Sequence, residues 1–230
     1  MRQLLFFDLD DTLLDHHGSQ AAAQRETWES HPAVFDGVDY ATWFPRYYKT
    51  NVALWDAYGR GEVTPQELRQ RRFAEPLAES GLDPSHADAL SGFYMASYAR
   101  HWRLTEGAEE ILEEAARHGT VGVLTNGFSE VQRAKLKRFD RQIGRFIEHL
   151  VLSEEVGAMK PSRVIFDAAW KRAGNSEPMR RVYVGDSFAH DVLGSKAAGW
   201  LPVLFNPLSR PLPAPVLYVT RLTDLKPLLS

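Results

Sequence analysis

The sequence predicts an α/β protein with a Rossmann-like, three-layer core, built on a parallel sheet and interrupted by an inserted all-helical domain. Three observations lead to this prediction. Short apolar runs recur along the chain, helical patterns separate the later runs, and a long segment near the N-terminus has helix starts but no strand-like run. Strands that alternate with helices in this way form parallel sheets that are covered on both faces.

Five short apolar runs are the predicted strands. The first lies in residues 3–9 (QLLFFDL) and ends in an acidic, turn-like stretch, which is typical of a buried parallel strand. The other four are Val121–Leu124, Leu150–Leu152, Arg181–Val184 and Pro202–Phe205. A sixth, strand-like segment at Leu217–Val219 follows a proline-rich surface stretch.

Helix signals lie between the later strands. Ser129 begins one helix and, with Gln132 three residues later, predicts a capping box. Ser162 precedes a second helix, which Gly174 ends. Residues 189–198 form a third.

The segment 16–104 is the predicted helical insertion. Thr64, Pro65 and Glu67 form an N-cap, first-turn proline and capping-box pattern. An aromatic-rich helical stretch runs from Trp43 to Tyr58. We therefore expect a core domain of residues 1–15 and 105–230 and a helical cap domain of residues 16–104.

Composition excludes several classes of protein. The chain has no cysteine, which excludes disulfide scaffolds, thiolate metal sites and cysteine nucleophiles. Its 27 basic and 30 acidic residues nearly cancel, which disfavours a partner that is a nucleic-acid polymer. No apolar run is long enough for a signal peptide or a membrane helix, so we expect a cytoplasmic protein without a membrane partner.

The first chemical motif follows the first strand directly. It contains Asp8, Asp10 and Asp11. Burying unpaired carboxylates beside a hydrophobic core costs free energy, and a bound cation offsets that cost. Hard oxygen ligands suit Mg²⁺. Side chains two positions apart in an extended chain point the same way, so Asp8 and Asp10 are expected to face one site, where one attacks and the other moves protons.

Three further motifs follow later strands, at the edge where open α/β sheets bind ligands. Thr125 and Asn126 offer hydrogen-bond donors for phosphoryl oxygens, Lys160 offers a positive charge, and Asp186 is a candidate metal ligand with Asp191 in support. Each motif alone has a structural alternative: a turn for residues 125–127, a surface loop for Lys160 and a helix N-cap for Asp191.

Together and in this order, the motifs DLDDT (8–12), TNG (125–127), KP (160–161) and GDSFAHD (185–191) resemble those of the haloacid dehalogenase (HAD) superfamily. The resemblance implies a sheet order of 3-2-1-4-5 and a helical cap after the first motif. It implies that Asp8 is the nucleophile and Asp10 the acid and base. Mg²⁺ would be held by Asp8, the backbone carbonyl of Asp10 and Asp186. Thr125, Asn126 and Lys160 would bind the phosphoryl group.

The second aspartate, Asp10, points to phosphatases or phosphomutases within that superfamily. Residues 51–64, 124–132 and 152–161 are similar to the pyrimidine 5′-nucleotidase branch, which implies substrates such as UMP, dUMP and dTMP. The base-contacting candidates are Trp43, Asn51, Trp55 and Phe128. For the aromatic residues among them, the alternative role is packing inside the cap.

Four functions stay open from the sequence. The leading one is an Mg²⁺-dependent phosphatase acting on nucleoside monophosphates, with Mn²⁺ or Co²⁺ as alternative metals and a monomer or homodimer as the assembly. The others are a phosphatase for sugar phosphates or phosphoglycolate, a phosphomutase, and a non-catalytic phosphate-binding protein.

Overall fold

The computed structural model describes residues 3–174 and 180–229. By contacts between residues, the chain divides into two compact units. The core unit consists of Met1–Asp15 and Arg103–Ser230, and the helical unit consists of His16–Trp102.

The core unit contains a parallel sheet of the predicted class. Its strand order is β3-β2-β1-β4-β5-β6, so the predicted order is confirmed and one strand, β6, is added beside β5. The sheet is one strand wider than the resemblance implied, because the strand-like segment predicted at Leu217–Val219 pairs with β5. The strands are β1 (Gln3–Phe7), β2 (Gly119–Thr125), β3 (His149–Leu152), β4 (Arg180–Gly185), β5 (Leu201–Phe205) and β6 (Tyr218–Val219).

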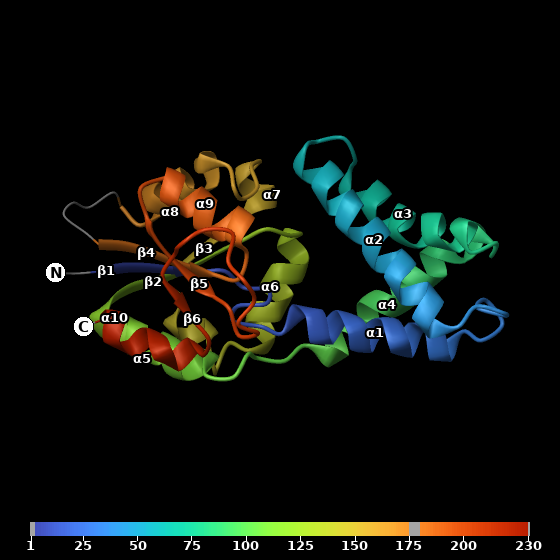
Figure 1. Cartoon of the computed structure of the whole chain (residues 1–230), viewed down its shortest axis with the longest axis horizontal. Helices are drawn as coiled ribbons and strands as arrows, with labels where there is room; N and C mark the ends of the chain where they lie inside the picture. The colour runs from blue at the N-terminus through green and yellow to red at the C-terminus, as the bar shows by residue number, and fades with distance from the viewer. Residues whose placement is uncertain (1–2, 175–179, 230) are drawn as a thin grey trace. The chain divides into compact units, whose positions relative to one another are not determined.

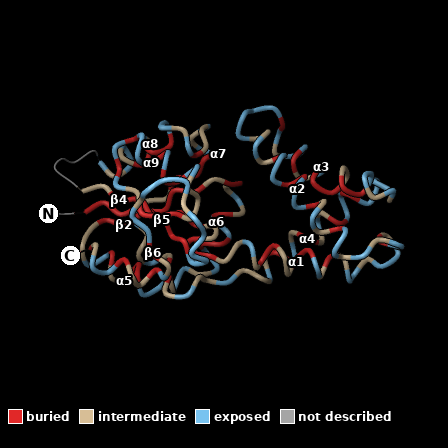
Figure 2. Tube along the Cα trace, in the orientation of Figure 1, coloured by how far each residue is buried: buried red, intermediate tan, exposed pale blue. Residues whose placement is uncertain are grey.

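Helices cover both faces of this sheet (Figure 1). On one face lie α8 (Arg163–Arg172) and α9 (Leu193–Ala197), and on the other lie α5 (Ala108–His118) and α10 (Lys226–Leu229). The helix α5 buries Ile111, Leu112 and Ala115 and leaves acidic residues in solvent, as an amphipathic helix on a sheet does. Figure 2 shows the resulting buried band along the central strands.

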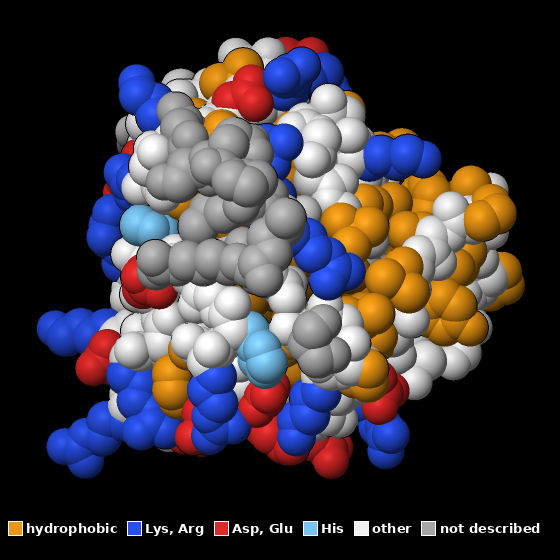
Figure 3. All heavy atoms as spheres, turned by 90° about the vertical axis from the view of Figure 1, so that its left-hand side faces the viewer, with side chains coloured by type: hydrophobic (Ala, Val, Ile, Leu, Met, Phe, Trp, Pro, Cys, Tyr) orange, Lys and Arg blue, Asp and Glu red, His pale blue; other side chains and the backbone are white. Residues whose placement is uncertain are grey.

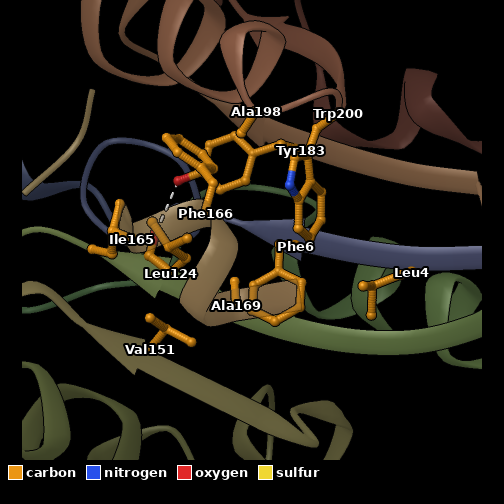
Figure 4. Close-up of a cluster of buried hydrophobic side chains, with 10 residues drawn as sticks. All are labelled: Leu4, Phe6, Leu124, Val151, Ile165, Phe166, Ala169, Tyr183, Ala198 and Trp200. Atoms are coloured by element: carbon orange, nitrogen blue, oxygen red, sulfur yellow. Dashed lines mark hydrogen bonds between the residues drawn. The ribbon is translucent and has the colours of Figure 1, made fainter. Parts of the chain in front are cut away.

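The interior of the core unit fixes how the strands align. All five residues of β1 are buried, and the ring of Phe6 packs edge-on against Trp200 (Figure 4). Phe6 pairs in register with Gly122, where an added Cβ would lie 2.4 Å from the Phe6 ring. Glycine at position 122 therefore makes room for the central aromatic side chain.

The same register brings the functional motifs to one edge of the sheet. Phe7 at the end of β1 is level with Val123 on one side and Val184 on the other. The residues that follow these positions include Asp8, Thr125 and Gly185. Parallel strands thus deliver their carboxyl ends to a common edge.

The shorter elements of the core unit include two departures from the sequence predictions. The helix α6 (Ser129–Arg138) begins where expected, but its N-cap is Phe128, which makes no side-chain cap, so the predicted Ser129–Gln132 capping box is wrong. The predicted helix 189–198 is a π-helical turn, η3 (Phe188–Val192), followed by α9. The remaining elements are α7 (Ser153–Val156), η2 (Gly144–Phe146) and η4 (Leu222–Leu225).

The helical unit is built from α1 (His16–Ser30), α2 (Tyr40–Gly59), α3 (Pro65–Glu79), η1 (Pro84–His86) and α4 (Ala87–His101). The Thr64–Glu67 capping box at the start of α3 is present, as predicted. Trp43, Tyr47, Phe73 and Tyr94 are buried and contact one another, so aromatic packing forms the interior of this unit.

The surface of the described chain carries mixed charges. On the face shown in Figure 3, basic and acidic side chains are interspersed, and hydrophobic side chains gather toward its right-hand side. Among the helices of the described residues, none combines the length and the apolar character that crossing a membrane requires.

Candidate active site

Three carboxylates meet at the carboxyl edge of the sheet. Asp8 continues β1, and its backbone N–H donates a hydrogen bond of 2.8 Å to the carbonyl of Val184. Asp8, Asp186 and Asp191 each place a carboxylate oxygen within 4.8 Å of the others. Asp8 and Asp191 are buried, at 6% and 1% exposure, whereas Asp186 is half-buried. The structure thus brings together three acids from two separate motifs.

Lys160 supplies the positive charge beside this cluster. Its Nζ lies 2.7 Å from Asp8 Oδ1 and 2.7 Å from Asp191 Oδ1. It also donates to the hydroxyl of Tyr183 at 3.0 Å, and that hydroxyl in turn donates to the carbonyl of Leu124. The surface-loop alternative for Lys160 is therefore wrong, since its side chain is buried and fully engaged.

Negative charge exceeds positive charge in this cluster: among the described residues its ion pairs come from Lys160, which pairs with Asp8 and Asp191, whereas the cluster has three carboxylates. Burial raises the pKa of Asp8 to about 7, with Asp191 adding to the rise and Lys160 opposing it. Burial, together with the charges of Asp191 and Asp8, raises the pKa of Asp186 well above its usual range. For Lys160, burial lowers the pKa, but the two carboxylates outweigh burial and raise it overall.

Gly185 explains how Asp191 reaches the cluster. A Cβ at position 185 would lie 2.3 Å from Cγ and Oδ2 of Asp191. The space that glycine leaves is filled by this carboxylate, which accepts a hydrogen bond of 2.9 Å from the backbone N–H of Ser187. The helix N-cap alternative for Asp191 is wrong, because Ser187 caps η3.

Asp10 lies beyond β1, in an isolated β-bridge with Leu14, and its side chain takes different partners from those of Asp8. Lys135 Nζ, from α6, lies 2.6 Å from Asp10 Oδ1 and 2.9 Å from Oδ2. Gln132 Nε2 lies 2.9 Å from Oδ2. The Asp10 side chain is not in the three-carboxylate group, so a metal contact from Asp10 stays a prediction for its backbone carbonyl only.

The second motif connects the loops of the site. Thr125 is 1% exposed, and its Oγ1 is 3.0 Å from Gln132 Nε2. The Asn126 side chain accepts from the backbone N–H of Lys160 at 2.9 Å and donates to the Lys160 carbonyl at 3.2 Å. The Asn126 amide therefore holds the lysine-bearing loop, whereas the sequence argument expected it to face a phosphoryl group.

The four base-contacting candidates lie in different surroundings. Trp43 has no exposed surface and packs on Phe35 and Phe73, which favours a packing role. Asn51 is 5% exposed and Trp55 is half-buried on the same helix, α2. Phe128 belongs to the core unit and is 5% exposed at the start of α6.

The donor set of the acidic cluster fits a divalent cation. Three carboxylates from Asp8, Asp186 and Asp191 converge, and two of them have pKa values raised by burial and mutual repulsion. A bound cation would offset that repulsion, and oxygen-only donors suit Mg²⁺. The uncompensated charge is thus evidence from the protein's own residues for a metal site.

The fold and this site define a class, and the comparison with known families agrees with it. The model of the haloacid dehalogenase-like hydrolases matches residues 3–199, so the chain belongs to this family of hydrolases.

Individual relatives are close enough to compare over nearly the whole chain. The sequence is 32% identical to the pyrimidine 5′-nucleotidase YjjG of Escherichia coli, covering 98% of this chain and 96% of that protein. It is 41% identical to a glyceraldehyde 3-phosphate phosphatase of Methanothermobacter thermautotrophicus, covering 90% and 86%. The crystal structure of the HAD-hydrolase YfnB of Bacillus subtilis, solved bound to magnesium, superposes with a TM-score of 0.82 at 26% identity and covers 99% and 98%.

Sequence reasoning missed three residues of this site: Gln132, Lys135 and Tyr183. The sequence predicts Gln132 to be part of a helix cap. Lys135 lies in the helix that begins at Ser129, for which only the start is predicted, and Tyr183 lies in a strand predicted from its apolar pattern. One signal was available for Lys135, because the three-residue spacing from Gln132 puts both side chains on the same face of α6.

Proposed function

We propose that this protein is an Mg²⁺-dependent phosphomonoester hydrolase that works through an aspartyl-phosphate intermediate. The observation that carries the proposal is the convergence of Asp8, Lys160, Asp186 and Asp191, with Asp10 held close by on a separate set of donors. A nucleophile, a charge to offset its repulsion from phosphate and a separate proton carrier are the groups that this reaction requires.

In the first step, an Oδ atom of Asp8 attacks phosphorus and the bond from phosphorus to the ester oxygen breaks. The Asp10 carboxyl gives its proton to the departing oxygen, so the product leaves as an alcohol. Lys160 lies against Asp8 and offsets the repulsion between carboxylate and phosphate.

In the second step, water attacks the phosphorus of the aspartyl phosphate. Asp10, now ionised, takes a proton from that water, inorganic phosphate leaves and the Asp8 carboxylate is restored. Splitting the hydrolysis into two steps lowers the barrier of each.

Mg²⁺ would be held by Asp8 and Asp186, with Asp191 in support. When bound, it supplies positive charge that lowers the repulsion between the attacking carboxylate and the phosphoryl oxygens. Asp191 also acts through Lys160, because its carboxylate holds that lysine in place.

Release of inorganic phosphate from 4-nitrophenyl phosphate tests the reaction. We expect turnover with Mg²⁺, none with a chelator, and loss of at least about 10³-fold for Asp8→Asn, which keeps the shape and removes the nucleophile. Acid-quenched protein should carry one phosphoryl group on residue 8. Full activity of Asp8→Asn would contradict the proposal, and no turnover of any phosphate ester would favour a binding protein.

For the substrate, we propose a pyrimidine nucleoside 5′-monophosphate. The support is the 32% identity to YjjG, a pyrimidine 5′-nucleotidase, over 98% of the chain. The glyceraldehyde 3-phosphate phosphatase at 41% identity supports a small sugar phosphate as the second candidate. A panel of UMP, dUMP, dTMP, AMP, glyceraldehyde 3-phosphate and phosphoglycolate separates the two, and equal kcat/KM for UMP and the sugar phosphates would contradict a nucleotidase.

Trp55 is the cap residue best suited to test base recognition. It is half-buried, and its ring meets Tyr58 edge-on. If Trp55 contacts the base, Trp55→Ala should raise KM for UMP about 10-fold and leave the KM for 4-nitrophenyl phosphate unchanged. Val52→Ala, an exposed position on the same helix, is the matched control.

A further inference from the structure

We propose that Lys135 and Gln132, both on α6, are positioning residues that clamp the Asp10 carboxylate for its acid–base role. This inference rests on the proposed function of Asp10. Both side chains lie on the helix that follows the second motif, and neither belongs to any of the four sequence motifs.

The contacts between Lys135 and Asp10 are short and largely shielded from water. Lys135 Nζ lies 2.6 Å and 2.9 Å from the two carboxylate oxygens, so it holds both of them. The Lys135 side chain is 3% exposed and that of Asp10 is 23% exposed. Lysine is rarely this buried without a partner, because the ammonium loses its hydration.

Gln132 connects this pair to the phosphoryl-binding motif. Its Nε2 lies within 3.0 Å of Asp10 Oδ2, of Thr125 Oγ1 and of the carbonyl of Asn126. A Cβ at Gly127 would lie 2.8 Å from the same nitrogen, and Gly127 has a φ of +144°. Because it has no side chain, the glycine of the second motif leaves room for the Gln132 side chain.

The chain thus assigns a different lysine to each catalytic carboxylate. Lys160 faces Asp8 and Asp191, whereas Lys135 faces Asp10. Asp10 lies beyond the end of β1, in an isolated β-bridge with Leu14, and the next residue, Asp11, adopts a φ of +59°. A side chain outside the sheet gains from being held, since misplacement by about 1 Å can cost about 10²-fold in rate.

Steady-state kinetics with Lys135→Met test the clamp. Methionine keeps the length and apolar stem and removes the charge. We expect kcat for 4-nitrophenyl phosphate to fall at least about 10-fold with KM within about threefold, because Lys135 holds Asp10 and not the substrate. Lys135→Arg should recover part of kcat. Lys137→Met, an exposed position on the same helix, is the matched control and should match the parent protein.

A double-mutant cycle separates positioning from general damage to the fold. In an Asp10→Asn background the clamp has no carboxylate to position, so adding Lys135→Met should change the remaining activity by less than about twofold. Because the leaving group of the aryl phosphate needs no proton, this substrate reports on the second task of Asp10, which is to take a proton from the attacking water. Equal fold-losses from Lys135→Met in both backgrounds would overturn the inference.

The outcomes also separate this inference from the proposed function. An inactive parent protein would refute the phosphatase, whereas an active parent with an unaffected Lys135→Met would refute the clamp alone. If Lys135→Met does not fold, Lys135→Gln, which keeps a donor but no charge, takes its place in the same cycle with the same expected non-additivity.

Discussion

The core unit and the helical unit place acidic side chains in opposite electrostatic situations. At the edge of the sheet, Asp8, Asp186 and Asp191 share one nearby lysine, and burial raises the pKa of Asp8 to about 7. In the helical unit, Glu26 stands alone among three donors from α4, and hydrogen bonds from Ser97, Arg100 and His101 lower its pKa to about 2.

The difference separates a carboxylate that stabilises the fold from a cluster whose arrangement fits the proposed chemistry. A carboxylate surrounded by donors stabilises the fold, whereas crowded carboxylates with too few cations destabilise it. Such crowding is retained in a protein when a ligand or metal uses the excess charge. The four predictions below test this contrast, from the largest expected effect to the smallest.

Gly185→Ala should have the largest combined effect on activity and stability, because its Cβ would overlap the Asp191 carboxylate. We expect a loss of about 10²-fold in phosphatase activity and of about 2 kcal/mol in the free energy of unfolding. Assays of phosphate release and urea unfolding measure the two. Gly92→Ala, where an added Cβ meets nothing within 4 Å, should be neutral or slightly stabilising. Similar results for the two variants would contradict the packing argument.

Mg²⁺ should stabilise the core unit. At a free concentration about 100-fold above its Kd, a ligand that binds only the folded state adds about 2.7 kcal/mol. Thermal unfolding with increasing Mg²⁺ measures the gain as a rise in Tm. Asp186→Asn should lose most of the rise, because it replaces one of the three carboxylates of the acidic cluster with a neutral amide. A Tm that rises equally in both proteins would place the metal elsewhere.

In the metal-free protein, the Asp8 carboxyl should make stability depend on pH. Its folded pKa lies above the unfolded value of 3.8, so its contribution is present at low pH and is lost as pH rises through about 7. The free energy of unfolding should therefore fall between pH 4 and pH 8. Urea unfolding in a chelator, compared with Asp8→Asn, isolates this contribution. Parallel pH profiles for the two proteins would show that burial does not raise the pKa of Asp8.

Glu26 should show the opposite pH dependence and the smallest effect. Its folded pKa lies below the unfolded value of 4.5, so its stabilisation is complete above pH 4.5 and is lost as pH falls toward 2. Because its side chain is 35% exposed, we expect Glu26→Gln to cost only about 1 kcal/mol at pH 7. Glu29→Gln on the same helix, whose pairing with Arg25 is long and exposed, is the control and should change stability by less.

Much of the fold was predictable because local patterns and the fold agree. The structure has a strand at each of the five predicted apolar runs, since a strand buried on both faces needs a continuous apolar sequence. The Thr64–Glu67 pattern became a capping box because its contacts are local. The Ser129–Gln132 pattern looked the same but failed, because Gln132 has better partners at the sheet edge.

The residues of the candidate site also divide into those that the sequence predicts and those that it does not. Asp8, Lys160, Asp186 and Asp191 were identifiable because each follows a strand, and parallel strands end at one edge. Lys135 was not, because its partner lies 125 residues away, and its spacing from Gln132 indicates a shared helix face without indicating what that face contacts. Trp43 illustrates the converse: an aromatic residue in a promising stretch packs entirely inside the helical unit.

The amino-acid sequence by itself determined the strands and the acidic residues that follow them, because period, burial and turn chemistry act over a few residues. Only the tertiary structure decided which lysine meets which carboxylate, which amide supports a loop and which glycine makes room for a side chain. Those outcomes depend on strand register and on the face that each helix buries, and both are set by packing between segments that are distant in the chain.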